Sequence, residues 1–552
     1  MYDRFGQGLV DYYDRTGSFG LATTLTNKAA QETVGIVPRL QDMHTIPTVD
    51  KNGNQMFLPA PTANFPVPFP PGNFTVGAGL DSSIKTPYAY TIDLSVGREL
   101  RGGLSLEVGY VGRLSHRLLT SEDLAMPLNF KDKKSGVDYF TAVDALGKLY
   151  RSGVKDETFS NSMLPANVVQ YWQDMISPLK PGGAYAIGAA AYPDGTSIAL
   201  MGGCVNTSDP TPPISTTNPV LAAFDGFCGG KFNETTPLQF LDTNGFQDIS
   251  NATTTCFNDP GDPSCTYYNP TTGPYTFFTP QYASLFAWRS MGTASYHALQ
   301  ATLRHRMSHG VQFDFNYTYS KSIDLSSDAE RVGTYGGIGG SWVINPWSPK
   351  QLRGVSDFDT THQFNANWLV DLPFGRGRTF GRDTNKVLDA VIGGWQLTGL
   401  FRMTSGFPIS IFNGFNFPTN WEQAGMAVQV GAAPKTGAYK NPDGTVNFFA
   451  VGGENAAAFF REPFPGESGQ RNILRGDGYF GVDMGLSKRW KMPWKESHSV
   501  QLRWEVFNIT NSSRFDAQTS LNVIDSYGSS FGNYTHLLTN PRVMQFALRY
   551  EF

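Results

Sequence analysis

Residues 88–112 read YAYTIDLSVGRELRGGLSLEVGYVG, and the pattern of this stretch recurs along the chain. From Tyr88 to Val96 every second residue is apolar, and mostly polar residues or glycine lie between them. After a turn at 101–103 the alternation resumes from Leu104 to Tyr110. Because successive side chains of a strand point to opposite faces, this stretch predicts a β-hairpin with one apolar and one polar face.

Further segments repeat this alternation, and together they predict nine strands. Besides the two strands of the first hairpin, they contain residues 299–303, 311–319, 364–372, 395–403, 480–486, 500–506 and 544–552. A weaker tenth strand is predicted at 18–26. Each is roughly 10 to 13 residues long, whereas strands of soluble proteins average about five or six and a tilted strand needs about 9–11 to cross a bilayer.

Short connections join one set of strand ends, and long connections join the other. The short ones are 101–103, 308–310, 373–393 and 491–497, and the long ones are 27–87, 114–294, 321–361, 405–478 and 510–541. This division is typical of bacterial outer-membrane barrels, whereas a large soluble β-sandwich gives no reason for it. The sequence therefore predicts an all-β fold, an antiparallel transmembrane β-barrel with short periplasmic turns and long extracellular loops.

The composition of the 552-residue chain agrees with a place in the bacterial outer membrane. Charged residues make up 16%, against about 25% in ordinary soluble proteins, and aromatic residues make up 13%. Since no run of 18 apolar residues occurs, a helical membrane span is excluded, and a β-barrel in contact with outer-membrane lipid remains. The net charge of -4 gives no general attraction to nucleic acid, so no such partner is expected.

The polar faces of the predicted strands carry charges in or near mid-strand. These residues are Asp93, Glu107, Arg304, Asp314, Arg503, Glu505 and Arg549. In a barrel they would face the lumen and contact a plug or a passing solute, or else pair with one another across the wall. The sequence leaves both roles open, and it offers these charges as the candidate functional surface.

The predicted periplasmic rim carries tryptophans and lysines. Trp490 and Trp494 lie beside Lys488, Lys491 and Lys495, which fits an aromatic girdle with lysines that reach the interface. Lys488 falls on the apolar register, but it is close enough to the turn for its ammonium group to reach the interface.

The connection 114–294 is predicted to be a long extracellular insertion that recognises a ligand or partner, because recognition concentrates in long loops on rigid scaffolds. It holds four cysteines, Cys204, Cys228, Cys256 and Cys265. These are disulfide candidates with three possible connectivities, of which sequential pairing makes the shortest loops. The alternative, a four-cysteine zinc site, lacks a C-x2-C pair.

The sequence shows no catalytic, cofactor-binding or metal-binding motif, so we expect neither an enzyme nor a cofactor. His305 and His309 are four residues apart, which is a ligand spacing on a helix. Here they flank a predicted hairpin turn, which favours a surface turn over a metal pair.

The last strand has alternating apolar residues, Leu548, Tyr550 and Phe552. Outer-membrane barrels resemble one another in ending with such a strand, which the barrel-assembly machinery recognises. An exposed strand with one apolar face is able to pair with another sheet edge. The resemblance predicts a barrel-assembly signal, and the alternative is an ordinary last strand that ends in Phe by chance.

Short motifs in and beside the predicted strands resemble one family. They are KTPY (85–88), LSVGREL (94–100), EVGYVG (107–112), SYHALQ (295–300), YTYSKS (317–322), DFDTTH (357–362), LPFG (372–375), GGW (393–395), SGFP (405–408), QRNILRG (470–476) and EVFN (505–508). In this order, over a little under half of the chain, they resemble the TonB-dependent receptors of the Oar-like type. Residues 120–290 contribute no motif.

This resemblance implies a barrel of about 22 strands around an N-terminal plug domain. The sequence shows about ten strands and neither a plug domain nor a TonB-contacting segment. Residues 1–552 therefore resemble the C-terminal part of a larger barrel, and a TonB complex is expected as partner only if a plug domain lies upstream.

Three functional hypotheses follow. The first is an outer-membrane receptor that takes up a large solute, whose identity the sequence does not give. The second is a structural or adhesive barrel that displays recognition loops. The third, a soluble secreted β-protein, predicts a chain that folds without detergent.

Overall fold

The computed structural model describes most of the chain, and the account below is confined to the residues it describes. These are 47–49, 55–57, 75–124, 129–175, 198–199, 215–216, 218–225, 282–327, 342–416, 424–432, 434–517 and 531–552. The weaker strand predicted at 18–26 and all four cysteines, Cys204, Cys228, Cys256 and Cys265, lie outside them.

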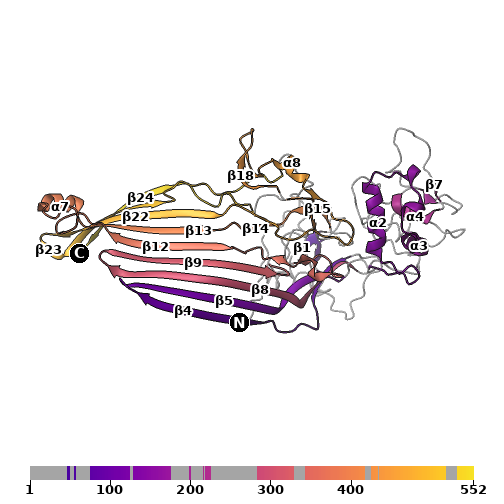
Figure 1. Ribbon diagram of the computed structural model, residues 1–552, viewed down its shortest axis with the longest axis horizontal. Coiled ribbons are helices and arrows are strands. Elements are labelled where there is room, and N and C mark those ends of the chain that lie inside the picture. Colours follow the sequence, from indigo (N-terminus) through magenta and orange to yellow (C-terminus); the bar gives the residue numbers. More distant parts are fainter. Residues whose placement is uncertain are drawn as a thin grey trace.

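Nine long strands form one antiparallel sheet in which each strand pairs with the next long strand along the chain (Figure 1). They are β4 (Tyr88–Leu100), β5 (Leu104–Asp123), β8 (Tyr282–Ser308), β9 (Val311–Asp324), β12 (His362–Asp371), β13 (Trp395–Thr404), β22 (Tyr479–Met492), β23 (Lys495–Phe507) and β24 (Val543–Glu551). All nine coincide with strands predicted from the alternation, which confirms the all-β antiparallel fold.

Short strands extend this sheet at the long-connection end. The strand β3 (Thr75–Leu80) runs parallel to β8, β10 (Trp342–Val343) runs parallel to β5, and β11 (Gly354–Val355) pairs with β9. The strands β5 and β8 also run well into the predicted loop 114–294, where they stay paired as far as Asp123 and Phe286.

The other elements belong to the connections. Small two-stranded pairs join β1 (Pro47–Val49) to β2 (Gln55–Phe57), β6 (Ile198–Ala199) to β7 (Ser215–Thr216), β14 (Pro408–Ile409) to β21 (Leu474–Arg475), β15 (Phe412–Asn416) to β16 (Ala424–Met426), β17 (Val428–Gln429) to β20 (Phe460–Arg461), and β18 (Thr436–Lys440) to β19 (Val446–Phe449). The α-helices are α2 (Tyr139–Arg151), α3 (Ala166–Met175), α4 (Pro219–Asp225), α7 (Lys386–Ile392) and α8 (Gly453–Ala457). None of the described helices is both long and apolar enough to span a membrane.

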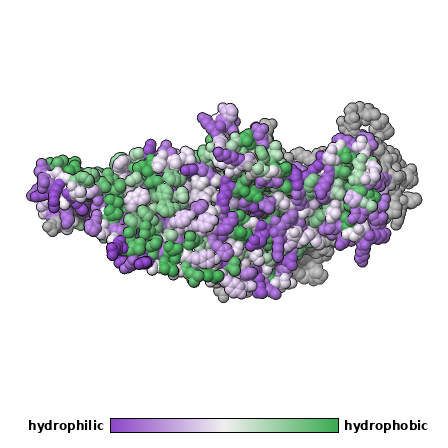
Figure 2. Space-filling model, in the orientation of Figure 1, coloured by the Kyte–Doolittle hydropathy of each residue, from purple (hydrophilic) through white to green (hydrophobic). Residues whose placement is uncertain are grey.

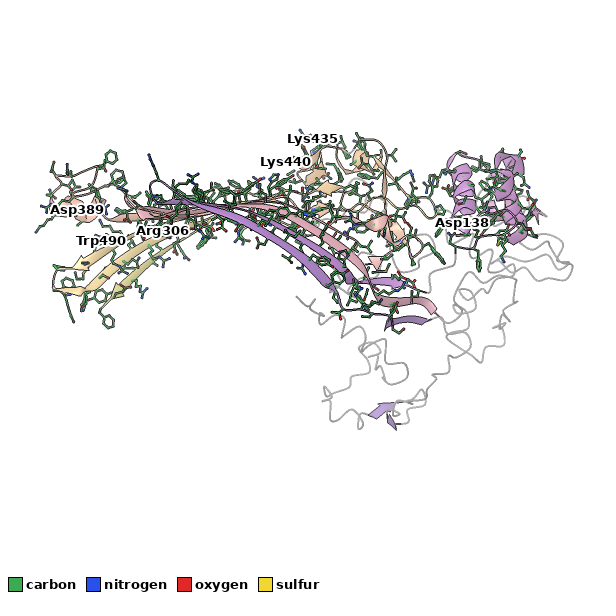
Figure 3. All side chains as sticks on the ribbon, turned by 60° about the horizontal axis from the view of Figure 1, so that its bottom comes forward. Asp138, Arg306, Asp389, Lys435, Lys440 and Trp490 are labelled. Carbon is green, nitrogen blue, oxygen red and sulfur yellow. The ribbon has the colours of Figure 1, made fainter. Side chains whose placement is uncertain are left out.

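The long strands form a single curved layer (Figure 3), and their apolar face is open to the surroundings. Tyr88 and Trp504, which a soluble β-sandwich would bury, are 39% and 36% exposed. Figure 2 shows hydrophobic residues gathered over the strands on the face in view, with hydrophilic residues toward both ends. Such a band matches the hydrocarbon layer between two water-facing rims.

Aromatic rings continue this apolar face from strand to strand. The ring of Phe364 in β12 lies 5.4 Å from that of Phe401 in β13, which lies 5.4 Å from that of Phe480 in β22. In β23 and β24, Trp504 stacks on Phe546 at 6.0 Å. Cross-strand aromatic pairs each stabilise a sheet by about 0.2–1 kcal/mol, so this row fixes the strand register as well as the face.

Gly399 in β13 leaves room for the indole of Trp368, its cross-strand partner in β12. A Cβ atom at position 399 would overlap the indole ring. We therefore expect Gly399→Val to lower the free energy of unfolding by about 1–3 kcal/mol, because overpacking displaces Trp368. Urea unfolding in lipid vesicles measures this loss. The background variant Trp368→Ala should accept valine at 399 at much lower cost, and an equal cost in both backgrounds would contradict the contact.

Packed cores lie in the connections at the long-loop end. One core joins α2, α3 and α4 around the fully buried Tyr139, Trp172 and Phe224. A second core gathers residues of the connections that follow β13 and β23, with Phe449, Phe460 and Phe531 in ring contact. The described parts of the predicted extracellular loops therefore form packed units on a curved wall.

Candidate functional site

The strand register places all seven predicted lumen-facing charges on one face of the sheet, opposite the aromatic row. Arg304 of β8 lies opposite Asp314 of β9 and donates to it from Nε at 2.8 Å. Arg503 donates to Glu505 two residues along β23, and the side chain of Gln545 in β24 also donates to Glu505. These contacts match the wall-pairing role that the sequence analysis describes, and contact with a solute stays a prediction.

The other predicted charges of this face lie near its two edges. Arg549 in β24 forms an ion pair with Glu551 at 3.3 Å. Glu107 lies opposite Gly97 and Thr302, and it lines a cleft of about 220 Å³ together with Glu99 and Arg304. Within the described residues, no ion pair is recorded for Asp93 or Glu107.

At the C-terminus, the residues of the predicted assembly signal point to the apolar side. Leu548 lies opposite Leu502 and Tyr550 opposite Val500, and Leu548, Tyr550 and Phe552 are all exposed. Among the described residues β24 pairs with β23 alone, so its second edge is open to a further strand.

Lys488, which was predicted to reach the interface, contacts the end of a helix instead. Lys488 is buried, and its ammonium group donates to the backbone carbonyls of Asp389, at 3.2 Å, and Gly393. These carbonyls lie at the C-terminal end of α7, where the helix dipole and unpaired acceptors favour a cation. The alternation does not predict α7. This helix binds the ammonium group of Lys488 and keeps it out of solvent.

His305 holds two periplasmic turns together. Its ring nitrogens lie 2.9 Å from the carbonyl oxygens of Gly102 and Val311, and His309 contacts its neighbour Ser308. No group of metal-ligating side chains occurs in the part of the chain that the structure describes.

Several of the family-like motifs meet in one buried network above the long strands. Arg471 of the QRNILRG motif forms an ion pair with Asp324 at the end of β9, and both side chains are buried. Asn472 donates through Nδ2 to Asp357 of the DFDTTH motif at 2.6 Å. Its backbone N–H donates to the hydroxyl of Ser410 at 3.0 Å. The long connections 321–361 and 405–478 are tied together at this point.

A second ion pair extends this network. Arg475 pairs with the buried Asp359 and donates to the carbonyl of Gly406 at 3.0 Å. Asp359 in turn accepts from the backbone N–H of Ser322 at 2.6 Å. The motifs thus hold the loops in place at the extracellular rim. Their side chains contact other residues of the strands and loops.

The helical unit of the 114–294 insertion docks on the loop that follows β20. Asp138 caps the N-terminus of α2 by accepting from the backbone N–H of Thr141 at 2.8 Å. At the other end of α2, Arg151 donates to the carbonyls of Glu462 and Pro463, both at 2.8 Å. Its guanidinium group lies 3.9 Å from the ring centre of Phe464, so a cation–π contact adds to the attachment.

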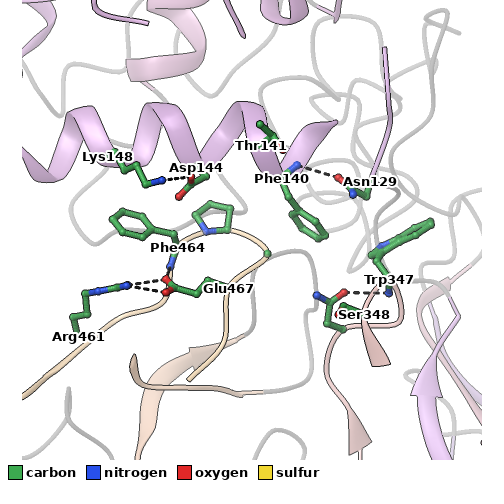
Figure 4. A pocket seen from close by; sticks show the side chains of 13 residues that line it. Asn129, Phe140, Thr141, Asp144, Lys148, Trp347, Ser348, Arg461, Phe464 and Glu467 are labelled. Atoms are coloured by element: carbon green, nitrogen blue, oxygen red, sulfur yellow. Dashed lines mark hydrogen bonds and ion pairs between the residues drawn. The ribbon is translucent and has the colours of Figure 1, made fainter. Parts of the chain in front are cut away.

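This docking forms an open pocket of about 570 Å³ (Figure 4). Its lining comes from three segments far apart in sequence and includes Asn129, Phe140, Asp144, Lys148, Trp347, Arg461, Phe464 and Glu467. The charges are paired, Lys148 with Asp144 at 2.6 Å and Arg461 with Glu467 at 2.7 Å. The size and the mixture of aromatic and polar groups suit a small-molecule ligand or a segment of a larger one.

The pairing of Glu467 fixes its charge. Burial acts to raise its pKa, but the hydrogen bonds from Arg461 and from the backbone N–H of Phe464 outweigh burial and hold the pKa below its usual value. The carboxylate is therefore ionised at neutral pH and keeps the turn that carries Phe464 in place.

Sequence reasoning missed this pocket. A signal for α2 exists, because Tyr139, Val143 and Leu146 recur at helical spacing and are fully buried in the structure. No local pattern in the sequence indicates that α2 lies beside Trp347 and Phe464. The ligand-recognition role predicted for the insertion stays a prediction.

The geometry defines a class of protein. A curved sheet has one apolar face open to the surroundings and one polar face, with short turns at one end and folded loops at the other. This is the architecture of an integral β-barrel protein of the bacterial outer membrane. The chain belongs to the family described as "Outer membrane beta barrel domain", which matches residues 1–170 and 241–545.

Solved structures give two similarities. One is the outer membrane transporter YddB from Escherichia coli, at 8% identity and a TM-score of 0.31, with 86% of this chain and 34% of that chain covered. The other is the FpvAI–pyocin S2 complex, at 8% identity and a TM-score of 0.27, with 85% and 28% covered. This chain spans about a third of the length of each. No match was found among curated proteins.

Proposed function

We propose that this chain forms the wall and extracellular surface of an Oar-like receptor of the TonB-dependent type, which takes up a large solute. The observation that carries the proposal is the charged face of the sheet, with Arg304, Asp314 and Glu505 opposite the lipid-facing side. A polar inner wall beneath folded loops suits passage of a solute that the loops first bind. The resemblance of the rim motifs to that receptor type supports the proposal.

Solute uptake by cells tests the proposal. We expect deletion of the gene to abolish growth on at least one nutrient too large for porins, from a panel of oligosaccharides, peptides and metal chelates. The wild-type gene should restore growth. If uptake of the whole panel is unchanged while surface attachment is lost, the adhesive barrel is the correct function instead.

A charge swap separates the two roles of the polar face. Arg304 and Asp314 form a partly exposed pair, so its contribution to folding is small, about 0–1 kcal/mol. We expect Arg304→Asp with Asp314→Arg to restore the ion pair and the folded yield but to leave uptake several-fold lower, if these charges contact the solute. Uptake rates in the single and double variants measure this, and full recovery in the double variant would assign the pair to the wall alone.

Two partners follow from the proposal. The barrel-assembly machinery would recognise Leu548, Tyr550 and Phe552 on the open edge of β24. A TonB complex would act on the receptor only where a plug domain is present, and the genomic sequence upstream of the codon for Met1 tests that condition. A plug domain in frame there would support energised uptake.

A further inference from the structure

The periplasmic connection 373–393 is attached to the lipid-facing side of the sheet. Trp395 and Trp490 lie on the apolar register of β13 and β22. Their indole Nε1 groups donate to α7 carbonyls, to Val391 at 2.8 Å and to Ala390 at 2.7 Å. Together with the contacts of Lys488, these bonds hold α7 beside the apolar face, at the short-turn end (Figure 1).

The helix α7 presents apolar side chains that nothing in the described residues covers. Val387 and Val391 are 79% and 63% exposed, and Leu388 between them is also exposed. In the preceding turn, Phe374 and Phe380 are exposed and lie 5.6 Å apart. A water-soluble surface rarely gathers such residues, whereas a helix at a bilayer interface buries them among the acyl chains.

Exposed basic side chains belong to the same connection as this apolar patch. Arg376, Arg378, Arg382 and Lys386 are exposed, and no ion pair is recorded for any of them within the described residues. Of the acidic residues in the connection, Asp389 accepts from the backbone N–H of Arg376 at 2.6 Å through its side chain. The connection therefore carries four basic residues against two acidic ones, Asp383 and Asp389, beside an apolar surface.

The fold of the connection is fixed without lipid. Asn385 caps α7 by accepting from the backbone N–H of Leu388 at 2.8 Å. The turn before it is closed by backbone hydrogen bonds from Gly375 to Phe380 at 2.8 Å and from Gly377 to Arg382 at 3.0 Å. A prearranged surface loses little conformational entropy when it binds.

We propose that 373–393 is a lipid-binding element that inserts Val387 and Val391 into the inner leaflet and binds anionic phospholipid headgroups through Arg376, Arg378 and Arg382. The apolar patch continues the lipid-facing side of the barrel, which selects a bilayer lipid over a soluble anion. The cations select a negatively charged headgroup over a zwitterionic one. The inference rests on the membrane position of the sheet and is independent of the solute taken up.

Lipid titration of the purified full chain in non-ionic detergent, followed by native mass spectrometry, tests this site. The probes are a phosphatidylglycerol and a phosphatidylethanolamine with the same acyl chains. The unaltered chain should bind the phosphatidylglycerol more tightly. We expect Arg376→Gln with Arg378→Gln and Arg382→Gln to weaken that binding by about tenfold or more, because each cation near a charged lipid surface contributes about a factor of five.

The control places the same kind of charge loss at the opposite end of the molecule. Lys435 and Lys440 are exposed in the loops and lie far from Asp389 and Trp490 (Figure 3). Lys435→Gln with Lys440→Gln should leave phosphatidylglycerol binding within twofold. Val387→Ser with Val391→Ser should weaken binding of both lipids. Equal affinity for the two lipids, or an arginine variant that binds as tightly as the unaltered chain, would overturn the proposal.

Discussion

Arginine in place of Phe401 should lower the free energy of unfolding in lipid vesicles by about 2–4 kcal/mol, which is the cost of a cation on the lipid side of a barrel near mid-membrane. Phe401 lies in β13 between the rings of Phe364 and Phe480. The loss of these two contacts adds to the cost, so Phe401→Leu serves to measure that part separately. Urea unfolding, followed by tryptophan fluorescence, gives the free energies.

The preceding residue in the same strand provides the matched control. Leu400 lies on the opposite face, across from Asp483 of β22 and Asn367 of β12. Because an arginine there would project to the polar side and meet the carboxylate of Asp483, we expect Leu400→Arg to change the free energy of unfolding by less than about 1 kcal/mol. Equal costs at 400 and 401 would show that the two faces of the wall are wrongly assigned.

The strands were predictable because the physics that forms them is local. In a strand between lipid and a polar interior, each side chain faces one of these two environments. The residues of β9 from Val311 to Tyr319 therefore alternate between apolar and polar. The same rule fails where both faces are covered. At the end of β5, Thr120, Ser121, Glu122 and Asp123 are all buried, so the alternation ends although the strand continues.

The candidate site was predictable only in part. The period of two fixes the face on which Arg503 and Glu505 lie, but it does not fix their partners, which are set by register and by side-chain length. The pocket depends on Trp347, Phe464 and α2, whose proximity is created by the tertiary fold. Long-range contacts of this kind leave no periodic signal in a single sequence.

The buried pair of Arg471 and Asp324 carries the other large effect. The Arg471 side chain is 1% exposed, and besides Asp324 its Nη2 group lies 3.4 Å from the carbonyl of Val355. Removal of one member of a buried ion pair leaves the other charge without compensation, at a cost of about 3–5 kcal/mol. We therefore expect Arg471→Met to loosen the two connections that meet here, with faster proteolysis of the loops and a lower urea midpoint.

Two further variants decide whether the charge or the shape of Arg471 is responsible. Arg471→Met with Asp324→Leu removes both charges, so it should recover part of the stability lost in Arg471→Met alone. Glu467→Gln breaks the more exposed pair with Arg461, and it should cost only about 1 kcal/mol or less. If the double variant is as unstable as Arg471→Met, the unpaired charge of Asp324 explains none of the lost free energy of unfolding. The network would then act through the packing of the Arg471 side chain.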